Sequence, residues 1–158
     1  MIKPHFEQDN VVINVPYGAV GITMERHRVI GVKLFQRTQE ISASTNQFAQ
    51  FVVDQFAQYF KQATSSFDIS YLMVGTLFQQ RVWRAIAEIP VGKVLTYTEL
   101  ADQLDSGPRA VANACGANKL PLLIPCHRVV AKNGMGGFMQ GIEGGLKIKE
   151  WLLAHESK

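Results

Sequence analysis

Apolar residues in the first third of the chain gather in three short runs that are rich in β-branched side chains. The runs cover residues 11–15, 19–24 and 29–35, and a turn-like Pro-Tyr-Gly segment at 16–18 separates the first two. Short runs of this composition, bounded by turn residues, are typical of β-strands. We therefore expect a small sheet at the start of the chain.

A helical pattern follows the three runs. Between Thr45 and Gln62, aromatic and branched residues recur at a spacing of three to four, which predicts a helix over this segment. The residues concerned are Phe48, Phe51, Val52, Phe56, Tyr59 and Phe60. We place a boundary near residues 70–76, so that residues 1–72 and 73–158 are expected to be separate domains.

The second half is predicted to be mainly helical. Thr76 is a suitable cap for a helix that runs to Ile89, where the segment 90–92 (Pro-Val-Gly) breaks it. Thr96 and Glu99 have the spacing of a capping box, which predicts a second helix to about Leu104.

A third predicted helix comes after the turn 105–107 (Asp-Ser-Gly). Ser106 or Gly107 would cap it, Pro108 suits its first turn, and Lys119 lies near its end. Two short helices that meet across a tight turn with glycine have the outline of a helix-turn-helix. An ordinary corner between two helices has the same outline.

Small side chains dominate the third predicted helix, from Ala110 to Ala117. Such a face lets the backbone lie close to another surface. One interpretation is close packing against a neighbouring helix. The other is a helix seated in a DNA groove, with Arg109 and Asn113 reaching further than the rest.

Composition limits the function classes. The chain has 158 residues, 47% hydrophobic and 18% charged, which is typical of a globular protein of one or two domains. No segment approaches the roughly 20 apolar residues of a membrane span. The first ten residues lack an apolar signal core, so we expect a cytoplasmic protein (nucleoid-associated if prokaryotic) with reduced cysteines. We interpret Cys115 as a small packing residue.

The positive charge is concentrated in one segment. Residues 106–142 carry four basic side chains and no acidic one, although the whole chain has a formal charge of only +3. A local positive field suits a polyanion such as DNA, but many solvated surfaces have the same composition.

The most informative run is residues 122–130, in which apolar segments flank Pro125-Cys126-His127-Arg128. A thiolate is the nucleophilic form of cysteine, nearby positive charge lowers the pKa of a thiol, and a histidine can act as its base. The chemistry alone leaves open a structural pair, a cysteine hydrolase or a group-transfer nucleophile. Neighbours in sequence do not face each other on a regular helix, so we expect Cys126 and His127 to lie in a turn or to be linked through water.

Residues 124–130 (Ile-Pro-Cys-His-Arg-Val-Val) resemble the active-site signature of the alkylguanine-DNA alkyltransferases, or methylated-DNA–protein-cysteine methyltransferases. The resemblance extends over most of residues 76–156. It includes residues 78–83, 89–94, 109–111, 117–119 and 149–156, together with Tyr97. It implies an α+β fold, in which a small ribonuclease-H-like N-terminal domain (an antiparallel sheet with a helix) precedes a mainly helical domain that binds DNA and accepts the alkyl group.

The resemblance also implies a catalytic group. Cys126 matches the nucleophile that takes an alkyl group from the 6-oxygen of guanine, and the implied substrates extend to 4-alkylthymine. His127 matches the histidine that removes the thiol proton through a water, and Glu156 matches the carboxylate that orients it. Asn118 matches the asparagine of the active-site turn.

A second group of positions is implied to bind DNA. Arg109 matches the residue that fills the gap left by the extruded nucleotide, and Tyr97 matches the residue that contacts that nucleotide. Val129 would offer a main-chain acceptor to the base. The partner is double-stranded DNA, bound by a monomer through the minor groove, with the small residues from Ala110 and the side chain of Asn113 on the contacting helix. No cofactor is implied, and we expect no zinc because the N-terminal half has no cysteine.

The loop 134–145 departs from the family pattern. Phe138 stands where a tyrosine is common, and Met139 or Gln140 replaces a hydroxyl residue. This loop normally forms one wall of the base pocket, so a glycine- and methionine-rich wall leads to the hypothesis that larger alkyl groups are accepted. The altered wall also leaves a second reading open, a non-enzymatic protein that binds alkyl lesions for another pathway. A helix-turn-helix transcription factor is a third.

Overall fold

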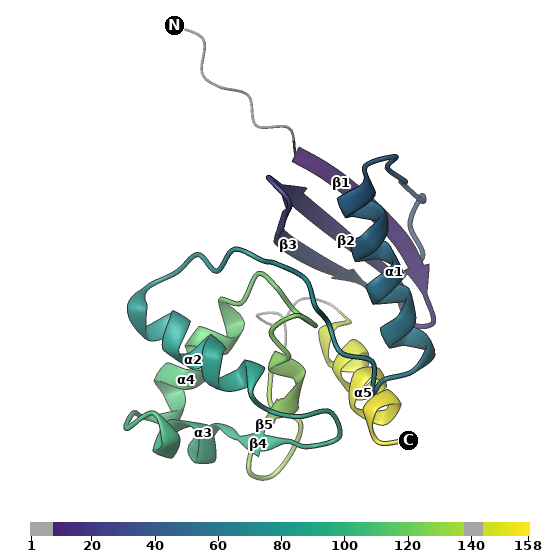
Figure 1. Cartoon of the computed structure of the whole chain (residues 1–158). Coiled ribbons are helices and arrows are strands. Elements are labelled where there is room, and N and C mark those ends of the chain that lie inside the picture. The colour runs from purple at the N-terminus through teal and green to yellow at the C-terminus, as the bar shows by residue number, and fades with distance from the viewer. Residues whose placement is uncertain (1–7, 138–143) are drawn as a thin grey trace, which may run out of the picture. The chain divides into compact units, whose positions relative to one another are not determined.

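The computed structural model describes residues 8–137 and 144–158. The chain divides into two compact units, Met1–Leu72 and Met73–Lys158. The first unit contains a three-stranded antiparallel sheet and a helix, and the second is mainly helical, which confirms the expected α+β class (Figure 1). No helix within the described ranges has the length and apolar character needed to cross a membrane.

The sheet of the first unit has the order β1 (Gln8–Val15), β2 (Gly18–Glu25), β3 (Arg28–Phe35). Both connections are two-residue hairpins. In the second hairpin Arg26 and His27 have φ of 52° and 60°, the left-handed backbone whose twist matches that of the flanking strands. The strands therefore form where the β-branched runs predict them, with somewhat wider bounds.

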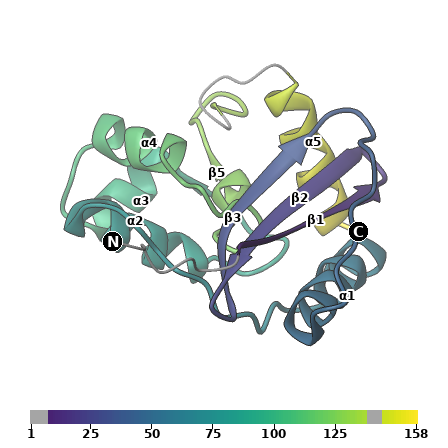
Figure 2. The same ribbon diagram turned by 90° about the horizontal axis from the view of Figure 1, so that it is seen from above.

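Helix α1 (Gln47–Lys61) covers the sheet on the β1 side (Figures 1 and 2). The side chain of Asn46 caps it by accepting hydrogen bonds from the first-turn amides. Its buried face consists of Ala49, Val52, Phe56 and Tyr59. Phe51, which the sequence pattern included in the apolar face, is 47% exposed because it lies to one side of this stripe.

The described residues of the second unit form four α-helices: α2 (Leu77–Ala87), α3 (Tyr97–Gln103), α4 (Pro108–Gly116) and α5 (Gly145–Glu156). Capping boxes begin two of them. Thr76 exchanges hydrogen bonds with Gln79 at the start of α2, and Thr96 does so with Glu99 at the start of α3. Both caps lie where the sequence predicts them.

Helices α3 and α4 pack against each other across the turn 104–107 and give the expected helix-turn-helix outline (Figure 2). Asp105 adopts a left-handed φ of 52° in this turn. Val111 and Ala114 form the buried side of α4. The indole Nε1 of Trp83 on α2 donates a hydrogen bond of 2.8 Å to the carbonyl of Ala114, which fixes α4 to the helix behind it.

A short parallel ladder was not expected. Strand β4 (Leu95–Thr96) pairs with β5 (Val129–Val130), so that Leu95 lies opposite Val129 and Thr96 opposite Val130. Strands of two residues leave no periodic pattern in a sequence. The ladder matters because it sets the start of α3 beside the residues that follow Cys126.

Removal of the α3 cap should destabilise the second unit. In Thr96→Ala the amide of Glu99 loses its acceptor, and we expect the free energy of unfolding to fall by about 1 kcal/mol. Thr98→Ala is the matched control, since Thr98 is exposed inside the first turn and caps nothing. Urea unfolding of the two variants checks this, and an equal loss in both would contradict the role of the cap.

Candidate active site

Cys126 begins a single 3-10 turn, Cys126–Arg128, which follows Pro125. Pro125 has φ −79° and ψ 66°, the geometry of an inverse γ-turn, and the Cys126 amide donates a hydrogen bond of 2.8 Å to the carbonyl of Ile124. The ring of proline pre-sets this φ and removes an amide that the tight turn would leave unbonded. The expected turn at Cys126 and His127 is therefore present.

Asn118, just beyond the end of α4, holds this turn from the side. Its amide Nδ2 donates to the carbonyl of Ile124 at 2.9 Å and to Sγ of Cys126 at 3.0 Å. Its Oδ1 accepts the amide of Leu120 at 2.9 Å. A single side chain thereby fixes both the backbone before the cysteine and the sulfur itself.

Backbone strain occurs close to the cysteine. Leu122 is buried and has a φ of 76°, in the left-handed region that branched residues rarely adopt. The following hydrogen bond, from the amide of Ile124 to the carbonyl of Leu120 at 2.8 Å, closes the loop around it. Strain of this kind persists only where the surroundings impose it, and it is common at functional sites.

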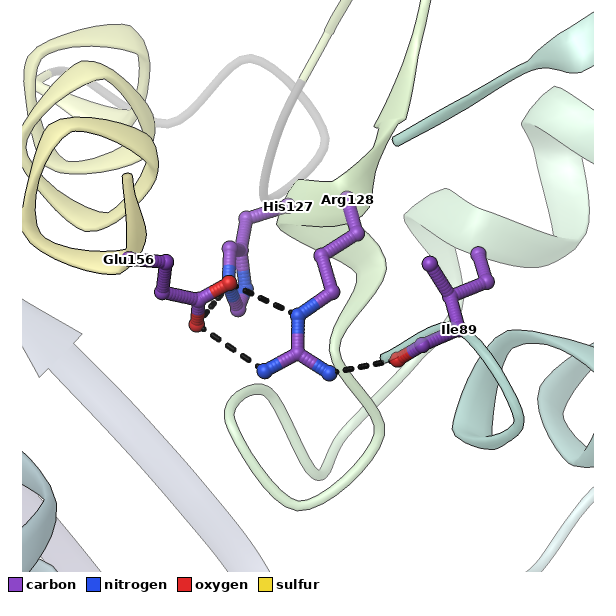
Figure 3. A network of polar contacts seen from close by, with 4 residues as sticks. All are labelled: Ile89, His127, Arg128 and Glu156. Carbon is purple, nitrogen blue, oxygen red and sulfur yellow. Dashed lines mark hydrogen bonds and ion pairs between the residues drawn. The ribbon is translucent and has the colours of Figure 1, made fainter. Parts of the chain in front are cut away.

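A buried ionic network lies behind the turn (Figure 3). Nε2 of His127 is 2.7 Å from Oε2 of Glu156, which lies at the end of α5. Arg128 binds the same carboxylate with two donors, Nε to Oε1 at 2.7 Å and an amino nitrogen to Oε2 at 3.0 Å. Its third donor reaches the carbonyl of Ile89 at 2.7 Å.

The guanidinium of Arg128 therefore forms an ion pair with Glu156. The sequence suggested that Arg128 adds positive field at the thiol, but the structure pairs its guanidinium with the carboxylate of Glu156. Burial lowers the pKa of His127, and the bond to Glu156 opposes that shift. His127 therefore keeps a neutral imidazole near pH 7, the form that can accept a proton.

The charge of Lys149 acts on the thiol, and no role for this residue was predicted from the sequence. Its side chain is fully buried, and Nζ donates to the carbonyls of Val129 at 2.7 Å and Gly137 at 2.9 Å. Burial lowers its pKa to about 8, and the charge on Lys149 in turn lowers the pKa of Cys126. The sequence held only a weak indication of this role, because Lys149 directly follows the core residue Ile148 in a segment that resembles the family.

Tyr97 lies near Lys149 and the backbone of residues 136–137. Its hydroxyl donates to the carbonyl of Gly137 at 3.3 Å, and Lys149 Nζ is 6.0 Å from its ring centroid. Burial raises the Tyr97 pKa to about 12, so the phenol remains a proton donor. Gly136 touches the ring so closely that an added Cβ would stand 2.7 Å from it, which explains a glycine here.

The sulfur of Cys126 is almost fully covered by the surrounding protein. Cys126 is 5% exposed, and its hydrogen bond with the Cys115 thiol, together with burial, raises the pKa of Cys126 above its usual range. The resting group is therefore a thiol and not a thiolate. It becomes a nucleophile only when a base takes its proton.

Other predicted residues lie on the outside of α4. Arg109, Ala110 and Asn113 are exposed on this helix, opposite its buried side. Phe138 and the altered segment after it lie outside the described residues. Among the residues that the structure covers, there is no group of three or more His, Cys, Asp or Glu side chains that could hold a metal.

Known proteins match both the sequence and the fold. Residues 77–158 match the family described as 6-O-methylguanine DNA methyltransferase, DNA binding domain. A methylated-DNA–protein-cysteine methyltransferase of Metallosphaera sedula is 32% identical over 85% of this chain and 86% of its own length. Another, of Mycobacterium bovis, is 35% identical over 91% of this chain and 89% of its own length.

Solved structures agree over nearly the whole chain. The O6-methylguanine methyltransferase of Mycobacterium tuberculosis superposes with a TM-score of 0.82 at 31% identity, covering 96% of this chain and 93% of that one. The same organism's protein in complex with DNA superposes with a TM-score of 0.76 at 31% identity, covering 93% and 92%.

The free energy of unfolding should depend on pH because His127 is harder to protonate in the folded protein. Because the folded chain lowers the His127 pKa below its ordinary 6.5, the unfolded chain binds a proton that the folded chain resists. The contribution of neutral His127 to the free energy of unfolding is complete above pH 6.5, and it is lost as the pH falls below that value. We expect the free energy of unfolding, measured by urea titration, to decrease over this range in the wild type. His127→Gln should show a smaller decrease, and identical slopes would contradict the assignment.

Proposed function

Since the chain belongs to the O6-methylguanine DNA methyltransferase family, we propose that the buried thiol of Cys126 is the group that accepts the alkyl group. The activity is that of a methylated-DNA–protein-cysteine methyltransferase, which repairs O6-alkylguanine in DNA. One observation carries the assignment of the residue: Asn118 Nδ2 holds the sulfur of Cys126 at 3.0 Å in the turn that leads directly into the network of His127 and Glu156.

The transfer is a displacement at the alkyl carbon. The sulfur of Cys126 forms a bond to that carbon while the bond from the carbon to the 6-oxygen of guanine breaks. The electron pair goes to the base, which takes up a proton and returns to ordinary guanine. The product at the protein is a thioether, which does not release the alkyl group again, so each chain acts once.

His127 is proposed to take the thiol proton. Glu156 engages Nε2, so exchange with the thiol side passes through Nδ1, and a bridging water completes the path that the family resemblance implies. Glu156 stabilises the imidazolium that forms, while Arg128 fixes the carboxylate with two hydrogen bonds. The resting thiol is thus ionised only as the alkyl group is transferred.

Tyr97 and Val129 are proposed to hold the base. The high pKa of Tyr97 keeps its phenol protonated, so it can donate a hydrogen bond to a leaving guanine. The Val129 carbonyl accepts one bond from Lys149, and a carbonyl oxygen has two lone pairs, so it can also accept a bond from the base. Lys149 therefore orients an acceptor in the pocket wall.

The exposed side of α4 is the proposed DNA surface. An alkylated oxygen inside a duplex is out of reach of a buried thiol, so the nucleotide must be extruded from the stack. Ala110 allows the helix to lie close to the floor of the minor groove, and Asn113 can reach its edge. Arg109 begins the helix and is proposed to fill the gap in the stack, with a monomer on each lesion.

The sequence leaves one alternative, a protein that binds the alkyl lesion but does not accept the alkyl group. The altered loop 134–145 left it open, and residues 138–143 of that loop lie outside the described part. The positioned thiol and its proton acceptor favour transfer, because a protein that only binds the lesion needs neither.

Mixing the protein with a short duplex that contains 6-methylguanine should add one methyl group per chain. Cys115 and Cys126 fall on different tryptic peptides, residues 110–119 and 120–128, so peptide mass spectrometry locates the group. We expect it on the second peptide only, and no transfer at all in Cys126→Ser. Tight binding of the lesion duplex without a mass change would support the alternative.

Arg109→Ala should slow repair of duplex DNA without slowing the reaction of a free base. Loss of the inserted side chain removes support for the extruded nucleotide, and we expect a decrease of about tenfold in the rate on duplex, or about 1.4 kcal/mol. The reaction with free 6-benzylguanine should not change.

Arg84→Ala is the matched control for that experiment. It removes an exposed arginine from α2 and lowers the net charge by the same amount. An equal decrease in both variants would mean that Arg109 contributes only general attraction to DNA.

A further inference from the structure

Gly136 occupies a position in the proposed site that leaves no room for a side chain. The turn 131–134, closed by a bridge between Ala131 and Gly134, reverses the chain directly after β5. Gly136 then adopts a left-handed φ of 74°. A Cβ added to it would stand 2.7 Å from Cε2 and 2.9 Å from the hydroxyl oxygen of Tyr97, and 3.1 Å from the amide nitrogen of Ala131. Side chains do not make contacts this short, so the backbone at Gly136 and the ring of Tyr97 fit each other only without a Cβ.

The position of the Tyr97 ring is set from both ends. The ladder of β4 and β5 places Thr96 opposite Val130, and α3 begins at Tyr97, the next residue. At the far end of the ring, the Tyr97 hydroxyl donates to the carbonyl of Gly137 at 3.3 Å. Hydroxyl donors usually lie about 2.7–2.8 Å from their acceptors, so this bond is long and weak.

The Gly137 carbonyl does not depend on the bond from Tyr97. The buried side chain of Lys149 donates to the same oxygen through Nζ at 2.9 Å. A bond from a charged donor is stronger than one from a neutral hydroxyl, so the carbonyl stays satisfied when the weaker donor leaves. The Tyr97 hydroxyl can therefore turn to another acceptor at little cost.

We propose that Gly136 is a positioning residue for the base: it admits the Tyr97 ring to a resting place from which the hydroxyl moves from the Gly137 carbonyl to the extruded base. The proposal rests on the proposed function, which makes Tyr97 a donor to that base. A methyl group at residue 136 would displace the ring and take the hydroxyl with it. Gly136 touches no substrate and acts through Tyr97.

The first test is Gly136→Ala, with methyl transfer from a 6-methylguanine duplex followed by intact mass in single-turnover experiments. We expect the rate constant at saturating duplex to fall by at least about tenfold, because a small misplacement near a reacting centre can cost up to about a hundredfold. Binding of an undamaged duplex of the same sequence should not change, because no base enters the pocket.

Gly134→Ala is the matched control for this variant. Gly134 lies in the same loop, and a Cβ added to it would have no other atom within 4 Å. Its rate should equal that of the wild type. An equal decrease in the two variants would overturn the proposal, because it would show that any added methyl group in the loop slows transfer.

A double-mutant cycle separates contact with the ring from strain in the backbone. Alanine at residue 136 is strained at a φ of 74° whatever its neighbours, whereas its contact with the phenol exists only when Tyr97 is present. In a Tyr97→Ala background, Gly136→Ala should therefore slow transfer no further than Tyr97→Ala alone. Equal factors in the two backgrounds would mean that residue 136 does not act through Tyr97, and the proposal would be wrong.

Gly136→Asn covers the case in which the alanine variant does not fold, and circular dichroism verifies the fold of every variant. Asparagine tolerates a left-handed backbone and carries the same Cβ, so it meets the ring with less backbone strain. It should slow transfer as Gly136→Ala does, and a wild-type rate would overturn the proposal. A wild type that accepts no methyl group would instead overturn the proposed function itself.

Discussion

The buried carboxylate of Glu156 is the constraint on which the site depends. An ionised carboxylate is costly inside a protein unless strong donors surround it, and here two nitrogens of Arg128 and one of His127 do so. These donors draw together the end of α5, the 3-10 turn and, through the carbonyl of Ile89, the segment after α2. Breaking such a buried pair typically costs about 3–5 kcal/mol, so the geometry at His127 is strongly maintained.

The two buried cations, Arg128 and Lys149, have different roles. Arg128 neutralises the carboxylate, and its planar fork gives the carboxylate one orientation. Lys149 fixes the carbonyls of Val129 and Gly137 and lends positive potential to the sulfur of Cys126. Burial lowers the pKa of His127, and the interaction with Cys115 together with burial raises the pKa of Cys126, so the imidazole is neutral and the thiol protonated at rest.

Local signals in the sequence predicted much of the fold, because strands, caps and helix stripes depend on nearby residues. The capping box of Thr96 and Glu99 and the apolar stripe of α1 are examples, although Phe51 proved exposed. The proposed nucleophile Cys126 and its neighbours followed from a contiguous motif that resembles a family. The ladder of β4 and β5, the burial of Lys149 and the partner of Arg128 depend on contacts between distant segments, and a pattern within one segment holds no information about them.

The network also sets the order in which a working site can arise. Its bonds close long loops, 29 residues between His127 and Glu156 and 39 between Ile89 and Arg128. Closing such a loop costs conformational entropy before the contact can stabilise the chain. Contacts of this range therefore form late in folding, whereas capped helices can form early. A chain still emerging from the ribosome can therefore carry Cys126 before it has α5, and its thiol then lacks the carboxylate that supports the base. Reactivity of the sulfur is a property of the completed fold.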